Sequence, residues 1–171
     1  GEDGNLLVIG IQTNELFQEK TFNRYDSLQK TLKGINGVED IISVPSAVNL
    51  VKDSMTEKLM AQPIFRDTSL SQREIDSSKN IFLSLPFYKT ILYNPETNAW
   101  LMGVRINKNV MNSKNRIGVV ESISSQANNF GKNNGLQIYL SGLPLIRTEM
   151  ATRIANEMKW FLVASVILSA F

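Results

Sequence analysis

A strand–helix–strand pattern that occurs twice is the feature that most constrains the fold. In its first copy, residues 6–12 form a near-continuous aliphatic run, as expected for a central strand buried on both faces. Residues 22–35 place apolar side chains at three- and four-residue steps. Residues 38–44 then form a second run rich in β-branched side chains, and Thr21 is expected to be the N-cap of the helix. Buried strands on either side of an amphipathic helix predict a βαβ unit over residues 6–45.

The second copy has the same order and punctuation. Residues 99–106 are expected to form a strand, residues 116–130 a helix and residues 136–140 another strand. These elements make a second βαβ unit over residues 99–144. Both units end in a serine with a proline shortly after it, Ser43 and Pro45 in the first and Ser141 and Pro144 in the second. Two such units predict an α+β fold, a ferredoxin-like split βαβ sandwich with two helices on one face of four strands.

Residues 46–98 form an insertion between the two units. The sequence from Ser71 to Glu74 is a capping box, which predicts a helix start. Val51, Met55 and Leu59 fit a short helix, although this part of the pattern is ambiguous. We therefore expect the insertion to be mainly helical.

The C-terminal region changes from amphipathic to wholly apolar. Residues 146–159 are expected to form a juxtamembrane helix that completes an extracytoplasmic domain, and residues 160–171 the start of a truncated transmembrane helix. Twelve helical residues reach about 18 Å, less than a bilayer core of about 30 Å. Lys159 and Trp160 would mark the membrane interface, and we interpret the chain as an excised piece of a longer protein. The alternative is a buried C-terminal core helix.

Composition argues against most kinds of chemistry. The 171 residues include 18 basic and 16 acidic side chains without a basic stripe, so no nucleic-acid partner is expected. The chain has neither cysteine nor histidine, the usual thiol nucleophile and the commonest general base. Glu39 and Asp40 are neighbours on a predicted strand and point to opposite faces, and Ser141 lacks both a nucleophile elbow and a histidine. We predict no catalytic residue, no metal site, no cofactor and no enzymatic activity.

Aromatic side chains gather in the insertion and on the strand beside it. Phe82, Phe87, Tyr88 and Trp100 are the candidates for lining an apolar ligand path. Their alternative role is the core beneath the insertion. Methionines that add an adaptable apolar surface are Met55, Met60 and Met102.

The chain resembles a known family in three features. They are the order of these segments, the exit from the last strand through Ser141-Gly-Leu-Pro144, and the charged helix that runs into an apolar one. They are similar to the first extracytoplasmic loop of the resistance–nodulation–division (RND) exporters, closest to the MMPL-like branch that exports hydrophobes and lipids. The resemblance covers essentially the whole chain. It implies a periplasmic porter domain at the bacterial inner membrane.

The resemblance also implies partners: a lipid or amphiphilic substrate, the lipid bilayer, the remainder of the parent protein and, in some members, a homo-oligomer. Proton flux through acidic residues of membrane helices would drive export, and residues 160–171 contain no acidic residue. Two other functions stay open. One is a docking domain of another membrane machine, such as an ABC-type export permease or a translocation accessory, and the other is a soluble enzyme.

Overall fold

The computed structural model describes residues 2–53 and 57–169. Its main sheet has five strands, in the order β2–β6–β1–β7, with β5 paired to part of β6. Every neighbouring pair in this sheet is antiparallel. The strands are β1 (Leu6–Gln12), β2 (Val38–Ile42), β5 (Tyr93–Asn94), β6 (Ala99–Ile106) and β7 (Ile138–Ser141).

This strand order interleaves the two repeats. Strand β6 of the second unit lies between β1 and β2 of the first, and β1 lies between β6 and β7. The fold is therefore α+β, and the order is compatible with the predicted split βαβ arrangement. Strand β1 is central, but Leu6 and Val8, which share one face, are only half-buried, so the expectation of burial on both faces is wrong for this strand.

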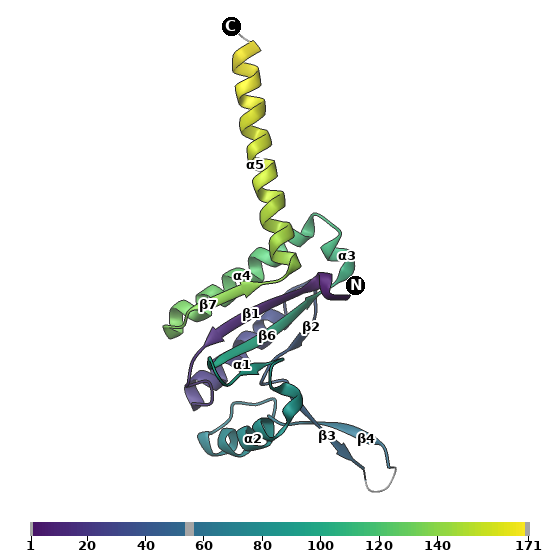
Figure 1. The fold of residues 1–171 in the computed structure, drawn as a ribbon, viewed down its shortest axis with the longest axis vertical. Coiled ribbons are helices and arrows are strands. Elements are labelled where there is room, and N and C mark those ends of the chain that lie inside the picture. The colour runs from purple at the N-terminus through teal and green to yellow at the C-terminus, as the bar shows by residue number, and fades with distance from the viewer. Residues whose placement is uncertain (1, 54–56, 170–171) are drawn as a thin grey trace.

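Two long helices lie on the same side of the sheet, and their side chains build the core with it (Figure 1). Helix α1 spans Glu19–Lys33 and helix α4 spans Asn115–Asn134. They contact each other directly, and the rings of Tyr25 and Phe130 lie 6.0 Å apart. Alternate residues of β6 are buried because a strand presents every second side chain to the same face.

The ends of these helices differ in detail from the prediction. Helix α1 begins at Glu19 with Gln18 at the N-cap, so the assignment of Thr21 as N-cap is wrong. The free amide of Glu19 is satisfied by the side chain of Gln72, which is distant in sequence. Helix α4 ends at Asn134 and is capped by Gly135, whose φ of +65° is the left-handed conformation that glycine accommodates at a helix C-terminus.

The insertion begins with a β-hairpin where a short helix was expected. Strands β3 (Val48–Lys52) and β4 (Leu59–Pro63) pair antiparallel, with Val51 opposite Met60. The short helix through Val51 and Leu59 is therefore wrong, and Met55 lies outside the described residues.

The capping box at Ser71 and Glu74 is confirmed. The Ser71 amide donates to Glu74 Oε2 at 3.0 Å, and helix α2 follows over Gln72–Ser84. The shorter helical segments of the chain are η1 (Glu2–Asn5), η2 (Pro86–Tyr88) and α3 (Lys108–Met111).

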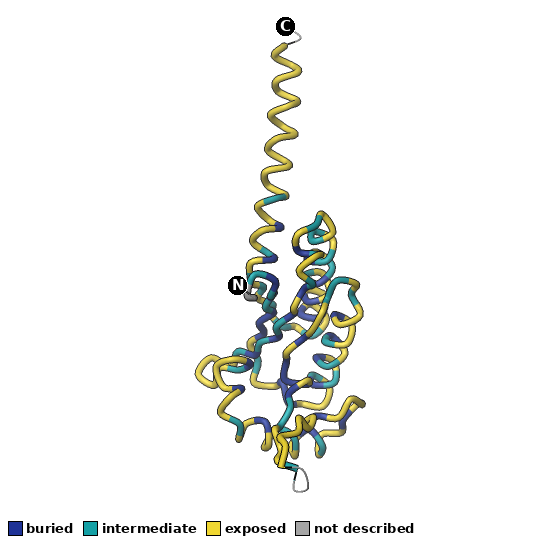
Figure 2. Tube along the Cα trace, turned by 90° about the vertical axis from the view of Figure 1, so that its right-hand side faces the viewer, coloured by how far each residue is buried: buried dark blue, intermediate teal, exposed yellow. Residues whose placement is uncertain are grey.

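Helix α5 (Leu143–Ser169) is one continuous helix that projects away from the rest of the molecule (Figure 1). From Glu149 onward, every described residue except Ala151 is exposed (Figure 2). In the described part of the chain, no helix has both the length and the apolar character that crossing a membrane requires. The predicted start of a transmembrane helix at residue 160 thus has no support from this criterion, and residues 170–171 lie outside the described ranges.

The N-terminal element lies beside the base of α5, whereas the C-terminal end of the described chain lies at the far tip of that helix (Figure 1). Element η1 contacts the first turns of α5, and the β3–β4 hairpin extends at the opposite end (Figure 1). Gly142 makes the sharp exit from β7 into α5, with a φ of +120°. A Cβ at this position would lie 2.4 Å from the carbonyl oxygen of Leu6, so only glycine fits there without a backbone shift.

Candidate functional site

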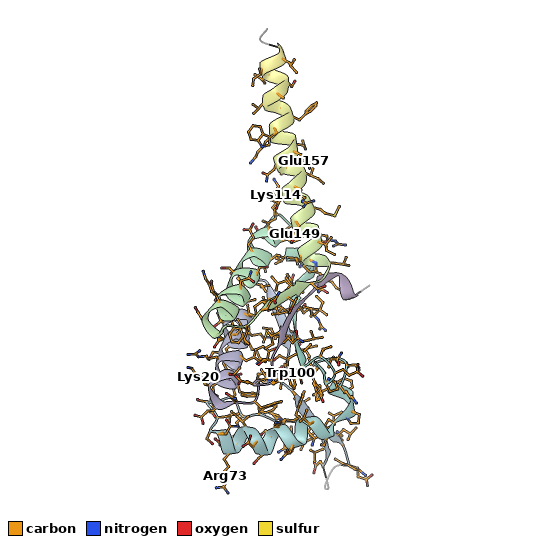
Figure 3. The ribbon with its side chains drawn as sticks, turned by 60° about the vertical axis from the view of Figure 1, so that its left-hand side comes forward. Lys20, Arg73, Trp100, Lys114, Glu149 and Glu157 are labelled. Atoms are coloured by element: carbon orange, nitrogen blue, oxygen red, sulfur yellow. The ribbon has the colours of Figure 1, made fainter. Side chains whose placement is uncertain are left out.

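Three of the four predicted ligand-lining aromatics lie in the core. Phe82, Tyr88 and Trp100 are all buried, and the rings of Phe82 and Tyr88 stack at 5.1 Å. Trp100 meets Phe17 edge-on at 5.3 Å and lies within the body of the molecule (Figure 3). The structure brings these three together as one aromatic cluster.

The polar atoms of this cluster are occupied by backbone groups. Trp100 Nε1 donates to the carbonyl of Thr13 at 2.9 Å. Tyr88 Oη donates to the carbonyl of Val48 at 2.7 Å and accepts from the Val48 amide at 2.8 Å. The Tyr88 bonds tie the core to the base of the hairpin, and neither side chain has a polar atom left without a partner for a ligand.

Phe87 behaves differently from its neighbours. It is 70% exposed, on the surface beside the buried Tyr88. None of the four predicted aromatics lines the cavity described next. Met102 is buried in the core, whereas Met60 is exposed on the hairpin.

Lys159 and Trp160, the predicted membrane-interface residues, lie on the projecting part of α5. Both are exposed, and Trp160 has 75% of its surface accessible. Two charged residues of the same helix, Glu149 and Glu157, are labelled along it in Figure 3. Helix α5 therefore presents a charged segment and then an apolar one, with Lys159 and Trp160 at the junction.

A cavity of about 480 Å³ lies between helix α1, the base of the hairpin and the segment that leads into α2. We call it the α1–hairpin cavity. Its apolar wall is formed by Ile41, Pro45, Val48, Pro63 and Phe65. Its charged lining residues are Asp26, Lys30, Lys33, Asp40, Arg66 and Asp67.

Lys30 is the centre of the charged lining. Its Nζ lies 2.7 Å from Asp26 Oδ2 and 2.7 Å from Asp67 Oδ1. Hydrogen bonds first to Asp26 and then to Asp67 raise the pKa of Lys30 above its ordinary value. The two carboxylates differ in exposure, because the Asp26 side chain is 15% exposed and that of Asp67 is 89% exposed.

The other cations of the lining are also paired. Lys33 Nζ lies 3.2 Å from Asp40 Oδ1, and Arg66 lies 3.0 Å from Glu74 Oε1. Below them, the buried Ser43 hydroxyl donates to Gln29 Oε1. The cavity thus combines an apolar wall with ion pairs at its surface.

The lining of the cavity is chemically mixed. The lining residues are carboxylates, ammonium and guanidinium groups, amides, Ser46 and apolar side chains, and they include no histidine to act as base for that serine. Within residues 2–53 and 57–169, no group of three or more histidine, cysteine, aspartate or glutamate residues has the geometry to hold a metal ion.

Sequence reasoning missed this cavity. From the sequence alone, Lys30 and Lys33 are charged residues on the surface of a predicted helix. Pro45 and Pro63 are residues that end a helix or a strand. They come together because the hairpin returns the chain to α1, and the hairpin was not predicted. The proline at each end of residues 45–63 was the available signal.

Comparison with protein families and with curated proteins finds no relative. No protein-family model matches the chain, and no curated protein shows significant similarity to it. The resemblance to exporter loops therefore stays a prediction from the sequence motifs. Helix α5 and the α1–hairpin cavity are the features of the described residues that bear on function.

Proposed function

We propose that this chain is the extracytoplasmic substrate-binding and gating domain of a proton-driven RND-type exporter of hydrophobic or amphiphilic molecules. It would lie on the periplasmic side of the bacterial inner membrane and would work without a cofactor. The energy would come from membrane helices of the parent protein. The observation that carries the proposal is the exposed apolar segment of α5.

From Trp160 to Ser169, α5 is exposed on all sides. Burial of large apolar side chains stabilises a protein by roughly 25 cal/mol for each Å² removed from water, and these side chains lack that stabilisation. A lipid environment would bury them, and ten helical residues reach about 15 Å into an apolar layer about 30 Å thick. Lys159 and Trp160 have the chemistry of residues at a lipid–water boundary.

The position of η1 fits the same proposal. A domain held between two membrane helices needs its first and last elements at the same end. Element η1 contacts the base of α5, so the two elements meet this requirement (Figure 1). The cavity and the hairpin would then lie away from the lipid surface.

The α1–hairpin cavity is the proposed substrate site. Its volume of about 480 Å³ falls in the range of roughly 300–1,000 Å³ found for small-molecule sites. An amphiphile has an apolar chain and a polar head, which match the apolar wall and the charged lining residues. No group in the cavity needs to react with the ligand for this role.

Membrane association can be tested with Trp160 as the probe. Vesicles of phosphatidylethanolamine and phosphatidylglycerol should shift its fluorescence to shorter wavelength as α5 enters the lipid. Trp160→Phe should remove the shift while the buried Trp100 still reports a folded protein. Val163→Asp should weaken vesicle binding, because a carboxylate is costly in the apolar layer. No shift for the unchanged protein would remove the main support for the proposal.

The transport part of the proposal needs cells. Disruption of the parent gene should increase the retained amount of a fluorescent amphiphile. An ionophore that collapses the proton gradient should raise retention only in the undisrupted strain. Equal retention in both strains would argue against export.

A second candidate function is a docking domain of another membrane machine. It is favoured by the β3–β4 hairpin, where Leu50, Leu59 and Met60 are 62%, 69% and 56% exposed. Such side chains on a two-stranded hairpin are typical of a surface that a partner covers. The parent sequence discriminates the two functions, because an RND exporter should repeat this layout in its second half.

A further inference from the structure

The charges that line the α1–hairpin cavity balance one another. The lining residues include three cations, Lys30, Lys33 and Arg66, and three carboxylates, Asp26, Asp40 and Asp67. A ligand with a single charge of either sign meets as many repelling groups as attracting ones. The cavity therefore offers no net attraction to a simple anion or a simple cation.

Lys30 and Asp67 form the pair that a ligand could open. Lys30 keeps a second carboxylate, Asp26, which is on the same helix and is 15% exposed, so the ammonium stays in place when Asp67 leaves. Asp67 is 89% exposed, and an ion pair that is open to solvent contributes about 0–1 kcal/mol. Separating these two groups costs little and presents both charges to the cavity.

A headgroup that carries both charges can replace both halves of this pair. Its anionic group would accept hydrogen bonds from Lys30 Nζ, and its cationic group would lie against the Asp67 carboxylate. Neither protein group is then left without a partner. A purely anionic ligand displaces Asp67 and is repelled by it, and a purely cationic ligand is repelled by Lys30.

We propose that the α1–hairpin cavity takes a zwitterionic single-chain amphiphile of the phosphocholine or phosphoethanolamine type. The headgroup lies between Lys30 and Asp67, and the alkyl chain lies against Ile41, Val48 and Phe65. The inference rests on the proposed amphiphile-binding function and adds the headgroup class to it.

Four probes with the same alkyl chain test the headgroup. They are dodecylphosphocholine, laurate, dodecyltrimethylammonium and dodecyl maltoside, each titrated below its micelle concentration and followed by calorimetry. Dodecylphosphocholine should bind about fivefold more tightly than the other three, which is the size expected for exchange of exposed ion pairs. Because the apolar part of α5 can also take up alkyl chains, the effect of substitutions in the cavity is the decisive readout.

Two substitutions should move the preference in opposite directions. Lys30→Gln should abolish the preference for phosphocholine and strengthen binding of the trimethylammonium probe, whereas Asp67→Asn should strengthen binding of laurate. Arg73→Gln, an exposed cation on α2 outside the cavity lining, should leave the order of the four affinities unchanged.

The outcomes separate the two proposals. If laurate, the trimethylammonium probe or dodecyl maltoside binds most tightly, or if neither cavity substitution changes the order, the headgroup inference is overturned and amphiphile binding stands. If none of the four probes binds, amphiphile binding by this cavity is overturned as well.

Discussion

Glu19 and Gln72 cap each other's helices. The Glu19 amide donates to Gln72 Oε1 at 2.8 Å, and the Gln72 amide donates to Glu19 Oε2 at 3.0 Å. These are the first residues of α1 and α2, whose N-terminal amides have no partner within their own helices. The pair therefore holds the insertion against the repeat that precedes it.

Removal of either partner of this pair should destabilise the protein. Glu19→Ala and Gln72→Ala should each lower the free energy of unfolding by about 1 kcal/mol, the usual value of a helix cap. Because the two side chains act together, the double variant should lose less than the sum. Urea denaturation measures all three. Gln126→Ala, at an exposed site on α4, should change stability by less than about 0.5 kcal/mol. Strict additivity would show that the two caps are independent.

Gly142 should tolerate no larger residue. Gly142→Ala brings a Cβ to 2.4 Å from the Leu6 carbonyl oxygen at a φ of +120°, so we expect a loss of about 2–3 kcal/mol. Gly118→Ala is the matched control, since it lies within α4 with no atom within 4 Å of the new Cβ. This control should gain about 0.5–1 kcal/mol in thermal unfolding. Equal effects at the two positions would contradict the steric explanation.

Tyr25 carries a buried hydroxyl with no hydrogen-bond partner among the described residues. Tyr25→Phe should therefore raise the free energy of unfolding by about 1 kcal/mol at neutral pH, as the cost of the unsatisfied group disappears. Tyr139→Phe, at a residue that is 50% exposed, should have little effect. A loss of stability in Tyr25→Phe would reveal a partner for the hydroxyl.

Because of Tyr25, the stability of the protein should also depend on pH in the alkaline range. Burial raises the pKa of Tyr25 far above its ordinary value of 10.0, because the charged form cannot be hydrated. In the unfolded chain the hydroxyl ionises near pH 10. Below about pH 10, Tyr25 therefore makes its full contribution to the free energy of unfolding, and the protein loses this contribution as the pH rises further. Urea denaturation between pH 9 and 11 should show a shallower decline for Tyr25→Phe than for the unchanged protein.

Phe82 and Phe87 lie close together in the sequence, but their truncation to alanine should change the stability of the protein very differently. Phe82 is 1% exposed, and Phe82→Ala should cost about 3–5 kcal/mol. Phe87 is 70% exposed, and Phe87→Ala should stay within about 0.5 kcal/mol of the unchanged protein. Thermal unfolding measures both. A large loss at Phe87 would mean that it packs against another part of the protein.

The strands of the two repeats could be predicted because their signal is local. Residues 6–12 and 99–106 carry unbroken apolar or alternating patterns, and β1 and β6 have those same bounds. The hairpin could not be predicted in this way. Its apolar residues are exposed on both faces, so it lacks the alternation of a half-buried strand, and Val51 and Leu59 imitate helical spacing.

The candidate site was harder to predict than the fold. A sequence does not distinguish an aromatic in the core from one that lines a ligand path, and Phe82, Tyr88 and Trp100 proved to be core residues. The α1–hairpin cavity is assembled from residues between Asp26 and Asp67 whose proximity depends on the hairpin. Asp67 acquires its role only through its contact with Lys30.

The central place of β1 also sets the order in which the chain can fold during synthesis. Leu6 pairs with Arg105, and Val8 pairs with Ser141. Strand β2 pairs with β6, which is also made later. No pair of the main sheet can therefore form before the second repeat has left the ribosome. The first repeat must remain without its sheet partners while the insertion is made. Such long-range pairing slows folding and exposes apolar strands to aggregation, so a nascent chain of this design gains from early protection of its first strand.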